Sequence, residues 1–170
     1  MAIRFDAASS SITIDTFAEG LLSAFAHDLR IEARAGTGES TTDDAITIRF
    51  PVASLVPIES SKKGKGDYHR IDPKDADDVA QRVRTQVFPG VEAVTVQAKR
   101  DGNDVTVVAQ KSARARLSLR VTDSGEAIVA EGQGTISLAE LGTGKVQVPM
   151  GAMKIKDEVR VRVKARFTKS

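Results

Sequence analysis

The side chains with the clearest capacity for acid–base or metal chemistry in this 170-residue chain are its two histidines, His27 and His69. His27 precedes Asp28, an arrangement that invites comparison with a catalytic dyad. Neighbouring residues on a strand point to opposite faces, however, so these two side chains are poorly placed to hydrogen-bond to each other. His69 lies far along the chain, without metal-ligand spacing. We therefore expect no metal site and no catalytic residue, and an enzyme that uses His27 and an acid is the weakest hypothesis.

His27 is nevertheless the best single candidate for a polar contact with a ligand. On a strand it shares a face with the apolar residues Phe25, Leu29 and Ile31, so we expect its imidazole to point inward. There it could donate a hydrogen bond to a polar head group at the mouth of a barrel. The alternative interpretation is a buried histidine that is satisfied by a backbone carbonyl.

Two glycine-containing segments, Gly132-Gln133-Gly134 and Gly142-Thr143-Gly144-Lys145, superficially resemble phosphate-binding loops. A P-loop requires glycine, four residues and then Gly-Lys-Ser/Thr between a strand and a helix. Here strand-like segments flank the glycines and the required order is missing. We interpret both segments as turns or bulges in a curved sheet.

Regular alternation of apolar and polar residues predicts the strands that position these side chains. From Val159 to Phe167 every odd position is apolar and every even one is basic, which places one face of a strand in the core and the other in water. The segment from Ala113 to Val121 repeats the pattern. Glycines near 102 and 125 are typical of hairpin turns between such strands. Shorter runs predict further strands at 11–17, 46–50, 91–98, 105–109, 127–132 and 135–138.

The segment 73–87 has the features of a helix instead. Asp72-Pro73 supplies an N-cap and a proline in the first turn, and apolar residues follow at spacings of three and four. The Ser-, Lys- and Gly-rich segment 59–67 is expected to be a mobile loop. The predicted fold is mainly β, an antiparallel lipocalin-like β-barrel of about eight strands with one interposed helix, and we expect residues 1–170 to form a single domain.

Composition limits the classes of function. The 25 basic and 23 acidic residues nearly balance, and aromatic residues are too few for stacking on bases, so no nucleic-acid partner is expected. The chain has no cysteine, which excludes disulfides and thiolate chemistry. No apolar stretch approaches the ~20 residues of a membrane span. We expect a cytoplasmic protein, or a periplasmic one if a leader has been removed.

Three parts of the chain resemble the YceI family, whose members are lipocalin-like barrels associated with long isoprenoid chains. The segments 12–15 and 20–31 resemble its opening strand and its histidine-containing second segment, and His27 is the residue that we align. The passage 87–96 resembles the strand that follows the family's helix and proline, and 136–161 resembles its last two strands. The segment 81–88 departs from the phenylalanine- and aspartate-rich stretch that is usual before the proline. The resemblance implies a carrier of an apolar chain.

The first functional hypothesis is therefore a non-catalytic binding or carrier protein that holds an isoprenoid- or lipid-like molecule inside the barrel, with no other cofactor. Alternation shows which face is apolar but leaves open whether that face encloses a cavity or a packed core. The ligand is expected to lie along nine inward residues, with His27 near one end. These residues are Ile14, Phe25, Ile48, Val94, Val96, Leu117, Leu119, Val161 and Val163.

The alternative is a ligand-free interaction module that binds an acidic partner through a basic outer sheet face. The alternating strands would carry their positive side chains on that face, although such side chains are often solvated or paired with acidic neighbours across strands. A homodimer is left open. The basic residues are Arg114, Arg116, Arg120, Arg160, Arg162, Lys164 and Arg166.

Overall fold

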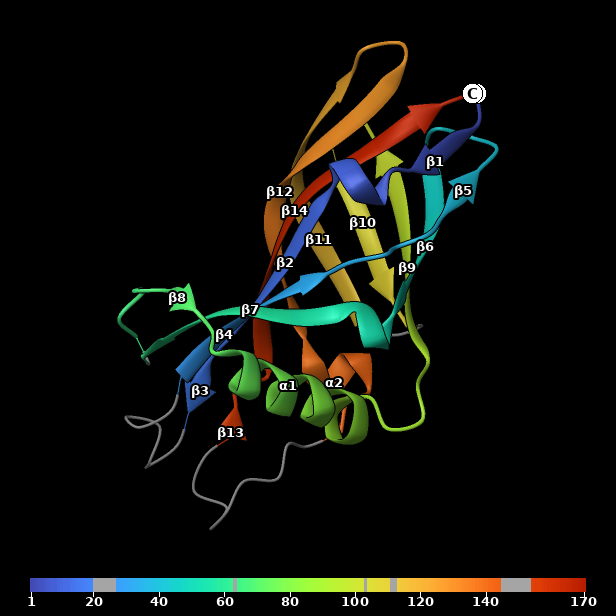
Figure 1. The fold of residues 1–170 in the computed structure, drawn as a ribbon. Coiled ribbons are helices and arrows are strands. Elements are labelled where there is room, and N and C mark those ends of the chain that lie inside the picture. The colour runs from blue at the N-terminus through green and yellow to red at the C-terminus, as the bar shows by residue number, and fades with distance from the viewer. Residues whose placement is uncertain (20–26, 63, 103, 111–112, 145–153) are drawn as a thin grey trace.

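The computed structural model describes residues 1–19, 27–62, 64–102, 104–110, 113–144 and 154–170, and most of them belong to one strongly curved antiparallel sheet (Figure 1). Its longer strands are β2 (Ser11–Thr16), β4 (His27–Ala33), β6 (Ala45–Pro51), β7 (Leu55–Lys62), β9 (Ala93–Asp101), β10 (Asp104–Ala109), β11 (Ala113–Asp123), β12 (Ala127–Ser137) and β14 (Glu158–Lys169). Short strands are β1 (Ile3–Phe5), β3 (Ala18–Glu19), β5 (Glu39–Ser40), β8 (His69–Arg70) and β13 (Lys154–Ile155).

The strand order confirms the predicted meander. The main path is β6-β9-β10-β11-β12-β14-β2-β4-β7-β8, so the hairpins expected near Gly102 and Gly125 join sequential neighbours. Both glycines have positive φ angles, +60° and +86°, which a residue with a Cβ adopts only at a cost. The inner positions of the sheet carry the apolar residues of each alternating run, as the periodicity predicts.

The sheet is lipocalin-like but is not closed. Within the described residues β6 and β8 stand at the two ends of the path and do not pair with each other. On one side of the opening, β1 pairs with both β14 and β5, and a single backbone bridge links Thr37 to Arg49 of β6. The described part of the large sheet has 12 strands rather than about eight, because short edge strands add to the longer ones.

The interpretation of Gly132 and Gly134 as turn or bulge residues is wrong. Both lie within β12, which pairs without interruption with β14 from Ala127 to Ser137. A Cβ on Gly132 would lie 2.0 Å from the carbonyl oxygen of Ser118 on β11. Glycine is therefore required here by the close approach of two strands rather than by a turn.

The predicted helix is confirmed over 73–87, with a change of geometry near its end. Helix α1 (Pro73–Arg82) begins at Asp72, whose carboxylate accepts a hydrogen bond from the Lys74 amide at 2.9 Å, and continues as a π-helical turn over Val83–Val87. A short helix, α2 (Leu138–Leu141), was not predicted. Both helices lie across one end of the curved sheet (Figure 1). No helix in the described ranges is long and apolar enough to cross a membrane.

Part of the segment 59–67, where a mobile loop was predicted, is a strand. Residues 59–62 belong to β7, and Glu59 and Ser60 pair with β8 across the hairpin. Ser61 is only 2% exposed, and its hydroxyl oxygen accepts a hydrogen bond from the Asp67 amide at 3.0 Å. Polar side chains in this segment therefore support a folded hairpin, which composition alone did not reveal.

Candidate functional site

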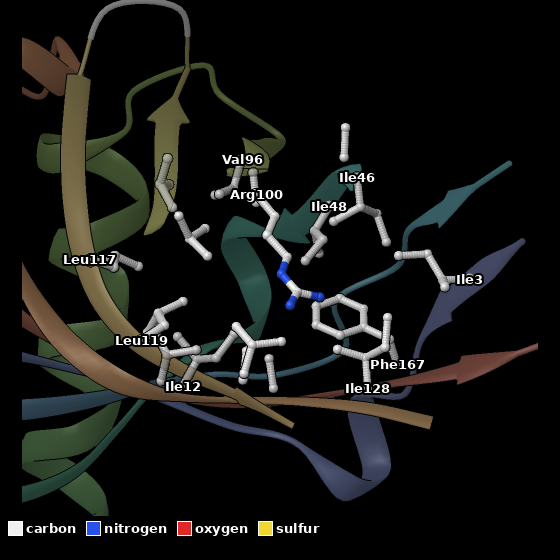
Figure 2. Close-up of a pocket in the computed structure, with 18 of the residues that line it drawn as sticks. Ile3, Ile12, Ile46, Ile48, Val96, Arg100, Leu117, Leu119, Ile128 and Phe167 are labelled. Atoms are coloured by element: carbon white, nitrogen blue, oxygen red, sulfur yellow. The ribbon is translucent and has the colours of Figure 1, made fainter. Parts of the chain in front are cut away.

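The concave face of the sheet encloses two adjoining apolar cavities, which we call the first and second chambers. The first chamber has a volume of ≈ 160 Å³ and lies between β6, the β9–β12 strands and β14 (Figure 2). Its apolar lining consists of Ile3, Ile12, Ala45, Ile46, Ile48, Phe50, Val96, Ala98, Val105, Val107, Leu117, Leu119, Val121, Ile128, Ala130, Ile136, Val161, Val163, Ala165 and Phe167.

The second chamber, of ≈ 230 Å³, lies where the two helices cover the end of the sheet. The apolar face of α1 and its π-helical turn contributes Val79, Val83 and Val87, so the amphipathic spacing of this helix serves to close the cavity. Phe88 after the π-helical turn and residues of the strands and α2 complete the apolar lining: Ile12, Ile14, Leu29, Ile31, Ala33, Phe50, Leu55, Val94, Val96, Ala109, Ile136, Leu138, Leu141, Ile155, Val159 and Val161.

Five residues line both chambers and form what we call the waist: Ile12, Phe50, Val96, Ile136 and Val161. They come from five different strands, so the waist is a ring of side chains around the interior rather than one protruding group. Each chamber has about tenfold or more the volume of ~10–15 Å³ that one water molecule requires. The interior thus contains two adjoining apolar cavities separated by these five side chains, and is not a fully packed core.

Polar groups in the lining are few. Arg100, Asp43 and Asp44 contribute to the first chamber, and Thr16 and Arg82 to the second. Arg100 continues the inward series Val94, Val96 and Ala98 along β9. Its Nε donates a hydrogen bond to the carbonyl oxygen of Gly102 at 2.7 Å, which fixes the base of the guanidinium at the end of the strand. A cavity of this kind can hold an apolar molecule and orient one polar end.

A buried ionic cluster lies on the opposite, outer face of the sheet. Asp15 of β2 is 2% exposed, and its carboxylate accepts hydrogen bonds from Arg30 of β4, at 2.9 Å, and from Arg162 of β14. Arg30 also donates to Glu59 of β7 at 2.7 Å, and its guanidinium lies 4.0 Å from the centre of the Tyr68 ring. The cluster therefore ties four neighbouring strands together behind the second chamber.

The electrostatics of this cluster follow from its geometry. Burial alone would raise the pKa of the Asp15 carboxyl, but the hydrogen bonds from Arg30 and Arg162 outweigh it and lower that pKa below its ordinary value. Burial raises the pKa of Tyr68, and the nearby carboxylates of Asp15 and Asp28 raise it further. Asp15 is therefore negatively charged and has a structural role, and the neutral side chain of Tyr68 packs against its partner Arg30.

The structure brings the predicted apolar site residues together. Every described apolar residue of that set lines one of the chambers: Ile48, Leu117, Leu119 and Val163 the first, Ile14 and Val94 the second, and Val96 and Val161 the waist. Phe25 lies outside the described residues. That these side chains contact a ligand stays a prediction.

The inward orientation expected for His27 is wrong. His27 is exposed at the first position of β4 and lies opposite Lys62 of β7, beyond Leu29, where pairing between β4 and β2 begins. Its neighbour Asp28 is the buried residue, at 5% exposed, and its carboxylate accepts hydrogen bonds from the amides of Ala18 and Gly64, each at 3.1 Å. The alternation in the sequence predicted an inward side chain at this position, but the sheet does not enclose the end of β4 where His27 lies.

Arg100 and the waist residue Phe50 were missed by the sequence analysis. Arg100 stands in the charged run Lys99-Arg100-Asp101, which resembles an ordinary solvent-facing strand end. Arg100 alternates with Val96 and Ala98 and so falls on the same inward face of the strand. An arginine at an inward position is unusual, and this could have marked it as a candidate site residue. Phe50 falls on the same face of its strand as the predicted lining residue Ile48, and this alternation could have identified it.

The basic side chains of β14 on the outer face are largely paired. Besides Arg162 with Asp15, Lys164 lies 3.1 Å from Glu131 and Arg166 lies 3.7 Å from Asp6. Arg160 lies over the ring of Phe17, with 5.5 Å between the guanidinium carbon and the ring centre. These pairs favour the interpretation of this face as solvated and internally neutralised. Across the described ranges, no three His, Asp or Glu side chains form a group that could hold a metal ion.

Two solved structures share this architecture along nearly their whole length. A polyisoprenoid-binding domain from Saccharophagus degradans, described as implicated in plant cell wall breakdown, superposes with a TM-score of 0.61 at 12% identity, over 99% of this chain and 98% of that one. BcnA from Burkholderia cenocepacia superposes with a TM-score of 0.59 at 14% identity, over 95% and 98% of the two chains. The chain shares the fold of both proteins.

The sequence resemblance to the YceI family is thus confirmed at the level of the fold. No family model and no curated protein matches the sequence. At such low identity the two structures show a shared fold and no more.

Proposed function

We propose that the protein is a non-catalytic binding protein that holds an apolar chain, of the isoprenoid or lipid class, along the two chambers. The observation that carries the proposal is the lining of these chambers, which is apolar on all sides except for a few groups. An empty apolar cavity is a source of instability, because its lining loses the packing contacts that a filled core would supply. A slender apolar ligand restores them.

The shape of the interior favours a long ligand over a compact one. Each methylene group that leaves water contributes about 0.8 kcal/mol, so affinity rises with the length of chain that the chambers accept. The waist divides the space into two, and a chain narrow enough to pass Phe50 and Val161 can use both parts. The name of the Saccharophagus degradans domain supports an isoprenoid as the first class to test.

A binding role without covalent chemistry accords with the groups in the lining. Among the described residues that line the chambers, the side chains that could move a proton are Asp43 and Asp44, both in the first chamber, and histidine is absent. Hydrogen bonds with Thr42 and with its own backbone lower the pKa of Asp44, which makes its carboxylate a weaker base. We therefore assign no general base to the interior.

The proposal is tested with delipidated protein and a series of neutral prenyl alcohols. Farnesol, geranylgeraniol and solanesol are titrated separately, and binding is followed by native mass spectrometry. We expect one bound molecule per chain and an affinity that increases from farnesol to geranylgeraniol. Protein that stays empty with every member of the series would refute the proposal.

A further inference from the structure

Arg100 is the cation that enters the first chamber. Its side chain extends from the end of β9 into the space bounded by Ile48, Leu119 and Phe167, and Figure 2 shows the guanidinium among these apolar side chains. The backbone amide of Arg100 donates to the carbonyl of Asp44 at 2.7 Å, and its Nε donates to Gly102 at the same distance. The side chain is therefore anchored at its base, with its terminal nitrogens directed into the cavity.

No carboxylate in the described part of the chain forms an ion pair with Arg100. Asp123, the acid whose pKa Arg100 helps to lower, is paired with Lys169. Asp44 is engaged with Thr42 and lies near Lys99. Asp43 and Asp44 also line this chamber, but neither of them forms an ion pair with the guanidinium.

The unpaired guanidinium has a consequence for the ligand. A cation among apolar side chains is costly unless a charged or hydrogen-bonding group meets it. The planar fork of arginine offers parallel hydrogen bonds that match a carboxylate or a phosphate. A neutral hydrocarbon offers these donors no acceptor, whereas an acidic head group does.

We propose that the ligand is an amphiphile with one anionic head group, a carboxylate or a phosphate, which Arg100 binds in the first chamber while the apolar chain extends through the waist into the second. This inference rests on the proposed function and adds the polarity and the orientation of the ligand.

The test compares matched pairs of ligands that differ only in the head group. Farnesyl phosphate is compared with farnesol, and palmitate with hexadecanol, by isothermal titration at low ionic strength. In the wild-type protein we expect the better anionic ligand to bind about ten- to a hundredfold more tightly than its neutral partner, which is the range of a charge-assisted hydrogen-bonded pair. The pair that shows the gain distinguishes a phosphate from a carboxylate.

Three variants assign the gain to Arg100. We expect Arg100→Gln to abolish the preference for the anion and to keep binding of the neutral partner, and Arg100→Lys to keep part of the preference. Arg120→Gln removes the same charge from an exposed position of β11 and should bind like the wild type. Circular dichroism and thermal midpoints verify that each variant is folded.

The outcomes separate this inference from the proposed function. A preference for the anion that disappears in Arg100→Gln alone supports the inference. Equal binding of charged and neutral partners, or a preference that survives in Arg100→Gln, overturns it and leaves the proposed function standing. Failure of all four ligands and of the longer prenyl alcohols would overturn both.

Discussion

The Nε atom of Arg30 donates a hydrogen bond to Oδ1 of Asp15 at 2.9 Å on the outer face of the sheet, where the carboxylate is 2% exposed. Arg162 binds the other carboxylate oxygen. Replacement of Asp15 by Asn removes the charge that both guanidinium groups face and leaves them to repel each other. We expect Asp15→Asn to lower the free energy of unfolding by about 2–4 kcal/mol, measured by urea denaturation at neutral pH.

The matched control is an exposed ion pair on the same face. Glu131→Gln breaks the contact with Lys164 between two side chains that are 49% and 65% exposed, and we expect a loss below about 1 kcal/mol. Equal losses in Asp15→Asn and Glu131→Gln would contradict the structural role assigned to the buried cluster.

Acid should weaken the protein through the same carboxylate. The pKa of Asp15 in the folded protein lies below the value of 3.8 for an unperturbed aspartate, so its contribution is complete above that value and is lost as the pH falls through the lower folded pKa. Asp15→Asn lacks this contribution at every pH but retains those of exposed acids such as Asp123 and Asp157, whose pKa values are also lowered. The difference in stability between wild type and variant should therefore shrink as the pH is lowered from neutral to about 3.

This pH dependence is measured by urea midpoints at several pH values. A difference between wild type and Asp15→Asn that stays constant from pH 7 to about 3 would show that the charge of Asp15 is not what stabilises the cluster.

We expect that even replacement of Gly132 by alanine destabilises the protein. An added Cβ would lie 2.0 Å from the Ser118 carbonyl oxygen and 2.8 Å from a methyl group of Leu119. Gly132→Ala should therefore destabilise the protein by about 1–3 kcal/mol, although glycine-to-alanine changes within a strand are otherwise favourable. The control Thr135→Ala, at an exposed position of the same strand, should cost less than about 0.5 kcal/mol in thermal or urea unfolding. A neutral Gly132→Ala variant would contradict the close approach of β11 and β12.

The fold and the apolar wall of the interior could be predicted from the sequence, because both depend on local periodicity. Residues such as Val161 and Leu117 lie in long alternating runs, where the parity of a strand fixes the face of every side chain. Helix α1 was predicted for a similar reason, since Asp72-Pro73 and the valine spacing are local signals. The cavity itself was not predictable, because periodicity shows which face is apolar and not how tightly it packs.

The polar features depend on contacts between distant segments and were missed for that reason. Asp15 lies on the polar face of β2, and only the positions of Arg30 and Arg162 on adjacent strands reveal that it is buried. His27 failed in the opposite way: its parity matches that of Leu29, but it lies at the first position of β4, beyond the pairing of β4 with β2, and is exposed. Arg100 was overlooked because it stands in the charged run Lys99-Arg100-Asp101, of which only the middle residue faces the cavity.

Binding of a ligand inside the two chambers can be tested by substitution at the waist. Val96 lines both chambers, whereas Gln97 is its exposed neighbour on the outer face of β9. The chain contains no tryptophan, so Val96→Trp and Gln97→Trp each introduce one bulky side chain that also reports by fluorescence.

The measurement is the affinity of delipidated wild type, Val96→Trp and Gln97→Trp for geranylgeraniol. We expect Val96→Trp to weaken binding by about tenfold or more, because the indole takes up space where the two chambers adjoin, and Gln97→Trp to bind like the wild type. Equal affinities in all three folded proteins would contradict binding inside the chambers, because the ligand would then bind somewhere other than the interior.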